Sequence, residues 1–257
     1  MTQQLTDLGA TDPPAHLEEL VAGLEPGGSV TRVYDRGRHP TGRQIDAVVV
    51  VRDARFADFV PVLDPLMIHT FGAILPGWHD LSAAPADGAR SVHLVARGDA
   101  LLRWRLQVIP EGAGASGPAG HPRPAPTTEN HVAEVLVRLH EALERTGEDR
   151  MLAAYEQISL ALDALAAVTW SMIGTAGAGR GWAELDEALA ATVLGRRCLT
   201  ALRDLTSAGM PAGVRELTGV IADILAVVEL TAPEVAQRWA GPLDSYRRYL
   251  GIWDRTR

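Results

Sequence analysis

The sequence predicts an α+β protein in which an N-terminal mixed sheet with flanking helices is followed by a C-terminal helical bundle. Residues 45–51 (IDAVVVV) are a continuous β-branched run, which is typical of a buried central strand. Residues 111–126 (EGAGASGPAGHPRPAP) have almost no apolar bulk, as expected of a linker. After this linker the apolar residues recur with helical spacing. We therefore predict a domain over residues 1–110, a linker over 111–126 and a helical bundle over 127–257.

The N-terminal domain should alternate between helices and strands. Apolar residues at helical spacing predict a helix over 16–25, which the following Pro26-Gly27-Gly28 ends. A second helix is expected from residue 55 to about 69. Short β-branched or alternating runs predict the strands 29–34, 45–51, 91–96 and 101–109, the last two joined as a hairpin.

The C-terminal domain should consist of helices that are separated by Gly or Pro. The predicted helices run over residues 129–146, 148–173, 182–207, 212–230 and 233–250. Four tryptophans fall at helical spacings in these segments, so we expect most of them in the core: Trp170, Trp182, Trp239 and Trp253.

Composition and charge restrict the classes of function. The N-terminus lacks the basic start and apolar run of a signal peptide. The stretch nearest to a membrane span, 158–173, carries Asp163 and is too short, so we expect a cytoplasmic protein with no membrane attachment. The net charge of −8 counts against a sequence-independent nucleic-acid binder.

The reactive side chains are restricted as well. The chain contains no lysine, so all 24 basic residues are arginines, and a Schiff-base, phosphate-loop or general-base lysine is excluded. The single cysteine, Cys198, excludes a cysteine-based zinc site and lies in an apolar helical stretch, where we expect it in the core.

Residues 30–50 combine a strand, a Gly-containing turn and an apolar strand with an acid near its start, and residues 102–110 (LRWRLQVIP) form a later strand. This order resembles the nucleotidyltransferase superfamily, especially the aminoglycoside adenylyltransferase type with a helical C-terminal domain. In that family a Gly-Ser turn contacts the triphosphate, the next strand opens with Asp-x-Asp, and a later strand carries a third acid. These carboxylates hold two Mg²⁺ ions that activate the acceptor hydroxyl and neutralise the leaving pyrophosphate. Residues 142–158 and 181–189 resemble helices of the family's second domain.

The resemblance implies a degenerate metal site. Asp46 matches the second acid of Asp-x-Asp, whereas Gln44 and Arg105 stand where the other two acids are expected. One carboxylate is a poor anchor for Mg²⁺. We expect Asp46 and Arg105 to form a bidentate pair, which would put a fixed positive charge at the metal position. Asp35, at the end of the neighbouring strand, could instead join Asp46 as a second metal ligand.

The resemblance also gives candidates for phosphate binding and for the acceptor. Gly37-Arg38 falls at the Gly-Ser position; using Gly28-Ser29 there instead would leave the first strand without sequence to form it. The candidate phosphate-binding residues are Gly37, Arg38, Gly42, Arg43 and Gln44, with Arg32 and Arg36 nearby. An acceptor site between the domains would be faced by acids of the first two C-terminal helices: Glu141, a candidate general base, with Glu144 and Glu156.

The leading hypothesis is a nucleotidyltransferase-like protein that has lost two-metal transfer and retains the cleft as a site for a nucleotide or polar small molecule, in specialised metabolism or regulation. The alternative is an active enzyme that transfers a nucleotidyl group to a hydroxyl of an antibiotic-like acceptor; Mg²⁺ and ATP or another NTP are implied only in that case. Metal-free catalysis by Arg105 and glutamates, and an interaction protein working through its helices, stay open, as does a homo-oligomer.

Overall fold

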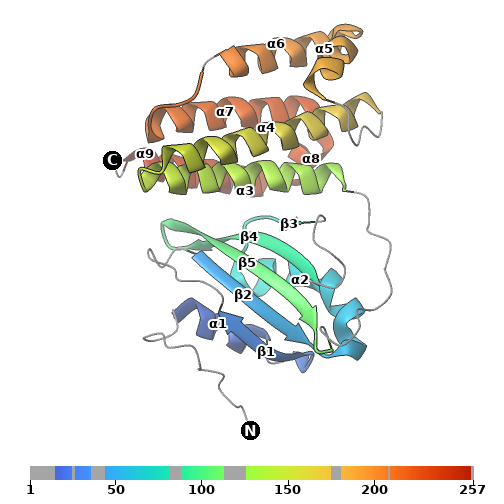
Figure 1. Ribbon diagram of the computed structural model, residues 1–257, viewed down its shortest axis with the longest axis vertical. Helices are drawn as coiled ribbons and strands as arrows, with labels where there is room; N and C mark the ends of the chain where they lie inside the picture. Colours follow the sequence, from blue (N-terminus) through green and yellow to red (C-terminus); the bar gives the residue numbers. More distant parts are fainter. Residues whose placement is uncertain are drawn as a thin grey trace. The chain divides into compact units, whose positions relative to one another are not determined.

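The computed structural model describes residues 15–24, 27–35, 44–80, 88–112, 126–174, 181–207 and 209–255, without the side chains of 15–17 and 252–255. The chain divides into two compact units, residues 1–125 and 126–257. The first holds a mixed sheet with helices, and the second consists of helices (Figure 1). The α+β class predicted from the sequence is therefore confirmed.

The N-terminal unit is built on a five-stranded sheet of order β1-β2-β5-β4-β3. β2 pairs with β5 in parallel, and the other neighbours are antiparallel. Its strands are β1 (Val30–Asp35), β2 (Gln44–Val51), β3 (Trp78–His79), β4 (Ala89–Arg97) and β5 (Ala100–Pro110). Its helices are α1 (Ala15–Leu24), the 3-10 turn η2 (Asp53–Arg55) and α2 (Phe56–Phe71). The predicted β4–β5 hairpin is present, whereas the two-residue strand β3 was not predicted.

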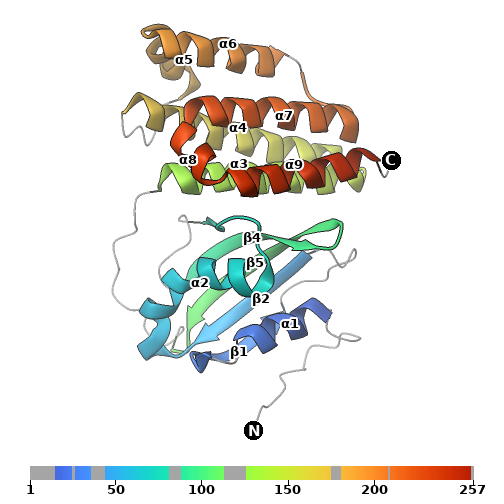
Figure 2. The ribbon, with the colours of Figure 1, turned by 180° about the vertical axis from the view of Figure 1, so that it is seen from behind.

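One face of this sheet forms the domain core with α1 and α2, which both lie on it (Figure 2). Odd-numbered residues of β2, such as Ala47 and Val49, and even-numbered residues of β5, such as Trp104 and Leu106, belong to this core. Since successive side chains of a strand point to opposite faces, the remaining residues of β2 and β5 project from the other face. We call this second surface the open face because α1 and α2 do not cover it, although several of its side chains, such as Val48 and Arg103, are buried.

Trp104 is the largest fully buried side chain of the chain's described part and anchors the core. Its ring lies 5.3 Å from that of Phe71 at the end of α2, in a tilted arrangement. The Arg97 guanidinium lies 5.6 Å from the Trp104 ring and bonds to Glu19 of α1 and to the Phe71 carbonyl. Sheet, α1 and α2 are thus joined at one point.

The C-terminal unit contains α3 (Thr128–Gly147), α4 (Met151–Ile173), α5 (Trp182–Ala190), α6 (Val193–Ser207), α7 (Val214–Thr231), α8 (Pro233–Arg238) and α9 (Ala240–Arg255). Within it, α3 packs most extensively against α4, and the α5–α6 pair forms an outer layer beside α4 and α7 (Figure 1). The single helices predicted over 182–207 and 233–250 are each two helices. The first breaks near Thr192, whose side chain caps α6 by accepting the Gly195 amide at 2.9 Å.

Helix α4 is the one helix of the described chain that is long and apolar enough to cross a membrane by length and composition. It packs against α3, α5 and α7, and its Asp163 side chain accepts a hydrogen bond from Trp182 of α5. These contacts are those of a helix that belongs to the bundle.

The predicted core positions of the tryptophans are partly correct. Trp170 and Trp239 are buried, as is Cys198, whereas 37% of Trp182 is exposed. The side chain of Trp253 lies outside the described residues.

A buried hydrogen bond joins the last helix of the bundle to the first. The Tyr246 hydroxyl, fully buried, donates to the Leu136 carbonyl of α3 at 3.1 Å, and burial raises the pKa of the phenol.

Tyr246→Phe should keep the packing and lower the free energy of unfolding by about 1 kcal/mol in urea titrations followed by circular dichroism. Tyr155→Phe on α4 is the control and should change it by less than about 0.5 kcal/mol; equal effects of the two would contradict the prediction.

Candidate functional site

The candidate site lies on the open face where β2 and β5 run side by side. The parallel register places Asp46 beside Arg105 and Gln44 beside Arg103. All four residues alternate with core residues of their strands, so their side chains project from the open face. The three positions that the resemblance singled out, 44, 46 and 105, are therefore neighbours on one surface.

Asp46 and Arg105 form the ion pair expected from the sequence. Arg105 Nη1 lies 3.8 Å from Asp46 Oδ2, with half of the arginine side chain and about a third of the aspartate side chain exposed. This distance is longer than a hydrogen bond, and it does not show the expected bidentate geometry. A half-exposed pair of this kind contributes at most about 1 kcal/mol to stability. The pair therefore affects the charge of this surface more than the stability of the fold.

Further polar residues extend the site along β5 and onto β4. Arg103 is 3% exposed and Gln107 7%, and Arg90 of β4 lies beside Gln107 on the same face. Three arginines and one aspartate give these strands a formal charge of +2 on the open face. On the same face of β1, Arg32 donates to the Tyr34 hydroxyl at 3.3 Å, a hydrogen bond that helps raise the arginine's pKa. The exposed part of this face, at Arg105, is suited to an anion.

The structure does not bring Asp35 to this site. Asp35 lies opposite Ala47, and Val33 opposite Val49, so the strand register puts Asp35 on the helix-covered face of the sheet. Asp46 projects from the opposite face. This register gives no support to a metal held by Asp35 and Asp46 together, which stays a prediction.

The described residues do not fit a two-metal centre. Within the chain's described ranges, no group of three or more His, Cys, Asp or Glu side chains is placed to hold a metal ion. Arg105 occupies the position next to Asp46 where a second carboxylate would be needed, and its guanidinium repels a cation. The candidate phosphate-binding residues of the turn, Gly37, Arg38, Gly42 and Arg43, together with Arg36, lie outside the described residues.

The acids expected at an acceptor site belong to the C-terminal unit. Glu141 and Glu144 of α3 are 3% and 5% exposed, whereas Glu156 of α4 is exposed. Glu141 Oε2 lies 3.6 Å from Arg138 Nη1, which also donates to Gln157 of α4 at 3.1 Å. Glu141 thus takes part in the α3–α4 packing, and its role as a general base stays a prediction.

A second polar cluster, which the sequence did not indicate, lies on the helix-covered side of the sheet. Asp64 of α2 bonds to His79 of β3 at 2.9 Å and to the Gly77 amide at 3.1 Å. His93 Nδ1 lies 3.8 Å from the other Asp64 oxygen, and His93 Nε2 lies 3.0 Å from the Ser91 hydroxyl. These residues join α2, β3 and β4.

Burial decides what this cluster can do. Ser91, His93 and Asp64 are arranged like a Ser-His-Asp triad, but Ser91 and His93 are only 1% and 0% exposed, so a substrate cannot reach them. Burial lowers the pKa of His93 to about 4, against a smaller opposite effect of Asp64. Burial alone would raise the pKa of Asp64, but the hydrogen bond and charge of His79, with His93 and the Gly77 amide, hold it below its usual value. A Cβ on Gly77 would lie 2.4 Å from the His93 ring, so the ring is closely packed.

Comparison with known proteins finds no family model that matches the chain and no curated protein that matches it.

Proposed function

We propose that the N-terminal domain is a nucleotidyltransferase-like domain without two-metal chemistry, which binds a nucleotide or a related phosphorylated small molecule on its open face. The observation that carries this proposal is the position of Arg105. It lies beside Asp46 in the parallel register of β2 and β5, where the resemblance leads us to expect a carboxylate. A fixed cation there takes the charge role of a metal ion.

The chemistry of the open face supports an anionic ligand. Arginine holds phosphate oxygens through paired N–H donors, without a metal. Half of the Arg105 side chain is exposed, so a ligand in solution can reach its guanidinium. Gln44, next to Asp46 along β2, adds an amide that both donates and accepts hydrogen bonds. The nearby Arg103 and Arg90 raise the local positive charge in a chain whose net charge is −8.

Calorimetric titration of the full chain with ATP, with and without Mg²⁺, tests the proposal. We expect ATP to bind without Mg²⁺, and Arg105→Ala to weaken binding by about tenfold or more, because a hydrogen bond to a charged group is lost. Arg55→Ala is the matched control, since it removes the same charge from an exposed position at the start of α2. Its affinity should stay within about twofold of the native value.

Two results would overturn the proposal. One is ATP binding that requires Mg²⁺, together with transfer to an aminoglycoside-type hydroxyl that Asp46→Ala abolishes; this would establish the active enzyme. The other is equal ATP affinity of the native chain, Arg105→Ala and Arg55→Ala, which would remove the open face from the binding site.

A further inference from the structure

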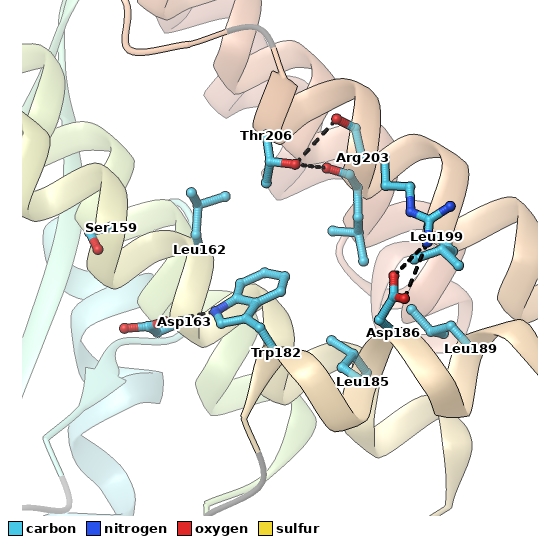
Figure 3. A pocket seen from close by; sticks show the side chains of 11 residues that line it. Ser159, Leu162, Asp163, Trp182, Leu185, Asp186, Leu189, Leu199, Arg203 and Thr206 are labelled. Atoms are coloured by element: carbon cyan, nitrogen blue, oxygen red, sulfur yellow. Dashed lines mark hydrogen bonds and ion pairs between the residues drawn. The ribbon is translucent and has the colours of Figure 1, made fainter.

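The C-terminal unit contains a cavity of about 430 Å³ between α4, α5 and α6 (Figure 3). This volume lies within the range of small-molecule sites, which begins at roughly 300 Å³. The cavity belongs entirely to the second unit, so it is independent of the open face and of the function proposed for it.

The wall of the cavity is apolar. Leu185 and Leu189, one helical turn apart on α5, are each 1% exposed, and Leu199 and Leu202 of α6 face them. The indole of Trp182, at the first position of α5, projects into the cavity from its edge, with 37% of the residue exposed (Figure 3). An exposed indole beside leucines offers an apolar ligand both area and an aromatic face.

Charged groups stand at two ends of the cavity (Figure 3). At one end, Arg203 Nη2 donates to both oxygens of Asp186, at 2.9 and 3.2 Å, which neutralises that carboxylate. At the other end, Asp163 of α4 accepts the Trp182 Nε1–H at 3.1 Å. Because the indole N–H is a neutral donor, the Asp163 charge is kept, and no arginine among the described residues pairs with it. The described residues that line the cavity therefore sum to a formal charge of −1, located beside the exposed indole.

We propose that this cavity binds a small apolar molecule that carries a protonated amine. The apolar body would pack against the leucines of α5 and α6, and the ammonium group would lie over the face of the Trp182 ring, on the side of the Asp163 carboxylate that the indole N–H does not occupy. A cation is attracted by the face of an indole and by an unneutralised carboxylate at the same time. A neutral ligand gains only the apolar contacts, and an anion meets the charge of Asp163.

Three probes of one shape separate these cases: 2-(1-naphthyl)ethylamine, its neutral alcohol analogue and 1-naphthylacetate. In calorimetric titrations of the full chain, the amine should bind at least about fivefold more tightly than the alcohol, and the carboxylate least tightly. Asp163→Asn keeps an acceptor for the indole N–H and removes the charge. It should reduce the preference for the amine to about twofold or less while leaving the affinity for the alcohol unchanged.

Asp204→Asn is the matched control, since it removes one negative charge from an exposed position of α6 that does not line the cavity. It should leave all three affinities unchanged. Equal binding of the three probes, or equal effects of Asp163→Asn and Asp204→Asn, would overturn the proposal. The proposal would also fail if none of the three probes binds and the chain sediments as a dimer that Trp182→Ala dissociates. The cavity would then be covered by a second copy of the chain.

Discussion

A chain in which Gln44 and Arg105 are both replaced by aspartate should bind Mn²⁺ or Mg²⁺ at least about tenfold more tightly than the native chain. Gln44 and Asp46 lie two residues apart on one face of β2, which is about 6.6 Å along the strand. Arg105 lies beside Asp46 on the neighbouring strand, about 4.8 Å away. The double variant therefore places three carboxylates around one point and removes the guanidinium that repels a cation.

Binding of Mn²⁺ measured by electron paramagnetic resonance tests this expectation. The Val62→Asp/Arg55→Asp variant is the matched control, because it changes the net charge by the same amount at exposed positions in and beside α2. Gln44→Asp alone should show little gain, since Arg105 keeps its charge. If the control and the double variant bind Mn²⁺ equally, the open face at positions 44, 46 and 105 is not a degenerate metal site.

The faces of the strands could be predicted for β2 but not for β1. The apolar run of β2 indicates a central strand. In its partner β5, apolar and polar residues alternate from Leu102 to Val108, so Asp46 and Arg105 could be assigned to one face. In β1 the register shifts between Val30 and Arg32, where a bulge or irregularity interrupts the pairing. An uninterrupted strand with Val30 in the core would turn Asp35 toward the open face and Asp46. The shift reverses this alternation, and nothing in the sequence marks it.

Other differences have a similar origin. The two-residue strand β3 is too short to show an alternation of apolar and polar residues. The break near Thr192 is made by a side-chain cap rather than by Gly or Pro. The Asp64–His79–His93 cluster is assembled from α2, β3 and β4, so no spacing of residues within one segment of the sequence predicts it. Long periodic segments and the α+β class were predictable, whereas contacts that depend on the tertiary register were not.

The buried His93 should make the N-terminal domain sensitive to mild acid. Its pKa is about 4 in the folded chain, below the value of about 6.5 in an unfolded chain. Above pH 6.5 both states hold a neutral imidazole, and the contribution of His93 to stability is complete. As the pH falls from 6.5 to 4, the imidazole of His93 becomes protonated in the unfolded chain but stays neutral in the folded chain. This difference lowers the free energy of unfolding by about 3 kcal/mol in total.

The neighbours of His93 set the limits of this pH window. The pKa of the Asp64 carboxyl is held below its usual value, so its stabilising effect is present above about pH 3.9 and is lost only at lower pH. The loss between pH 6.5 and 4 therefore comes from the imidazole rather than from this carboxylate. The Ser91 hydroxyl, which lies 3.0 Å from His93 Nε2, does not titrate in this range.

Removal of the imidazole isolates this effect. His93→Asn should lower stability at neutral pH, but the loss of stability per pH unit between 6.5 and 4 should fall by about 1.4 kcal/mol relative to the native chain. Urea unfolding followed by pulsed hydrogen exchange of peptides from β4 and β5 reports this domain separately from the bundle. His69→Asn, at an exposed position of α2, is the control and should keep the native pH dependence. If His93→Asn also keeps it, the buried imidazole is not the acid-sensitive group, and the packing of Gly77 against its ring is its main contribution to the fold.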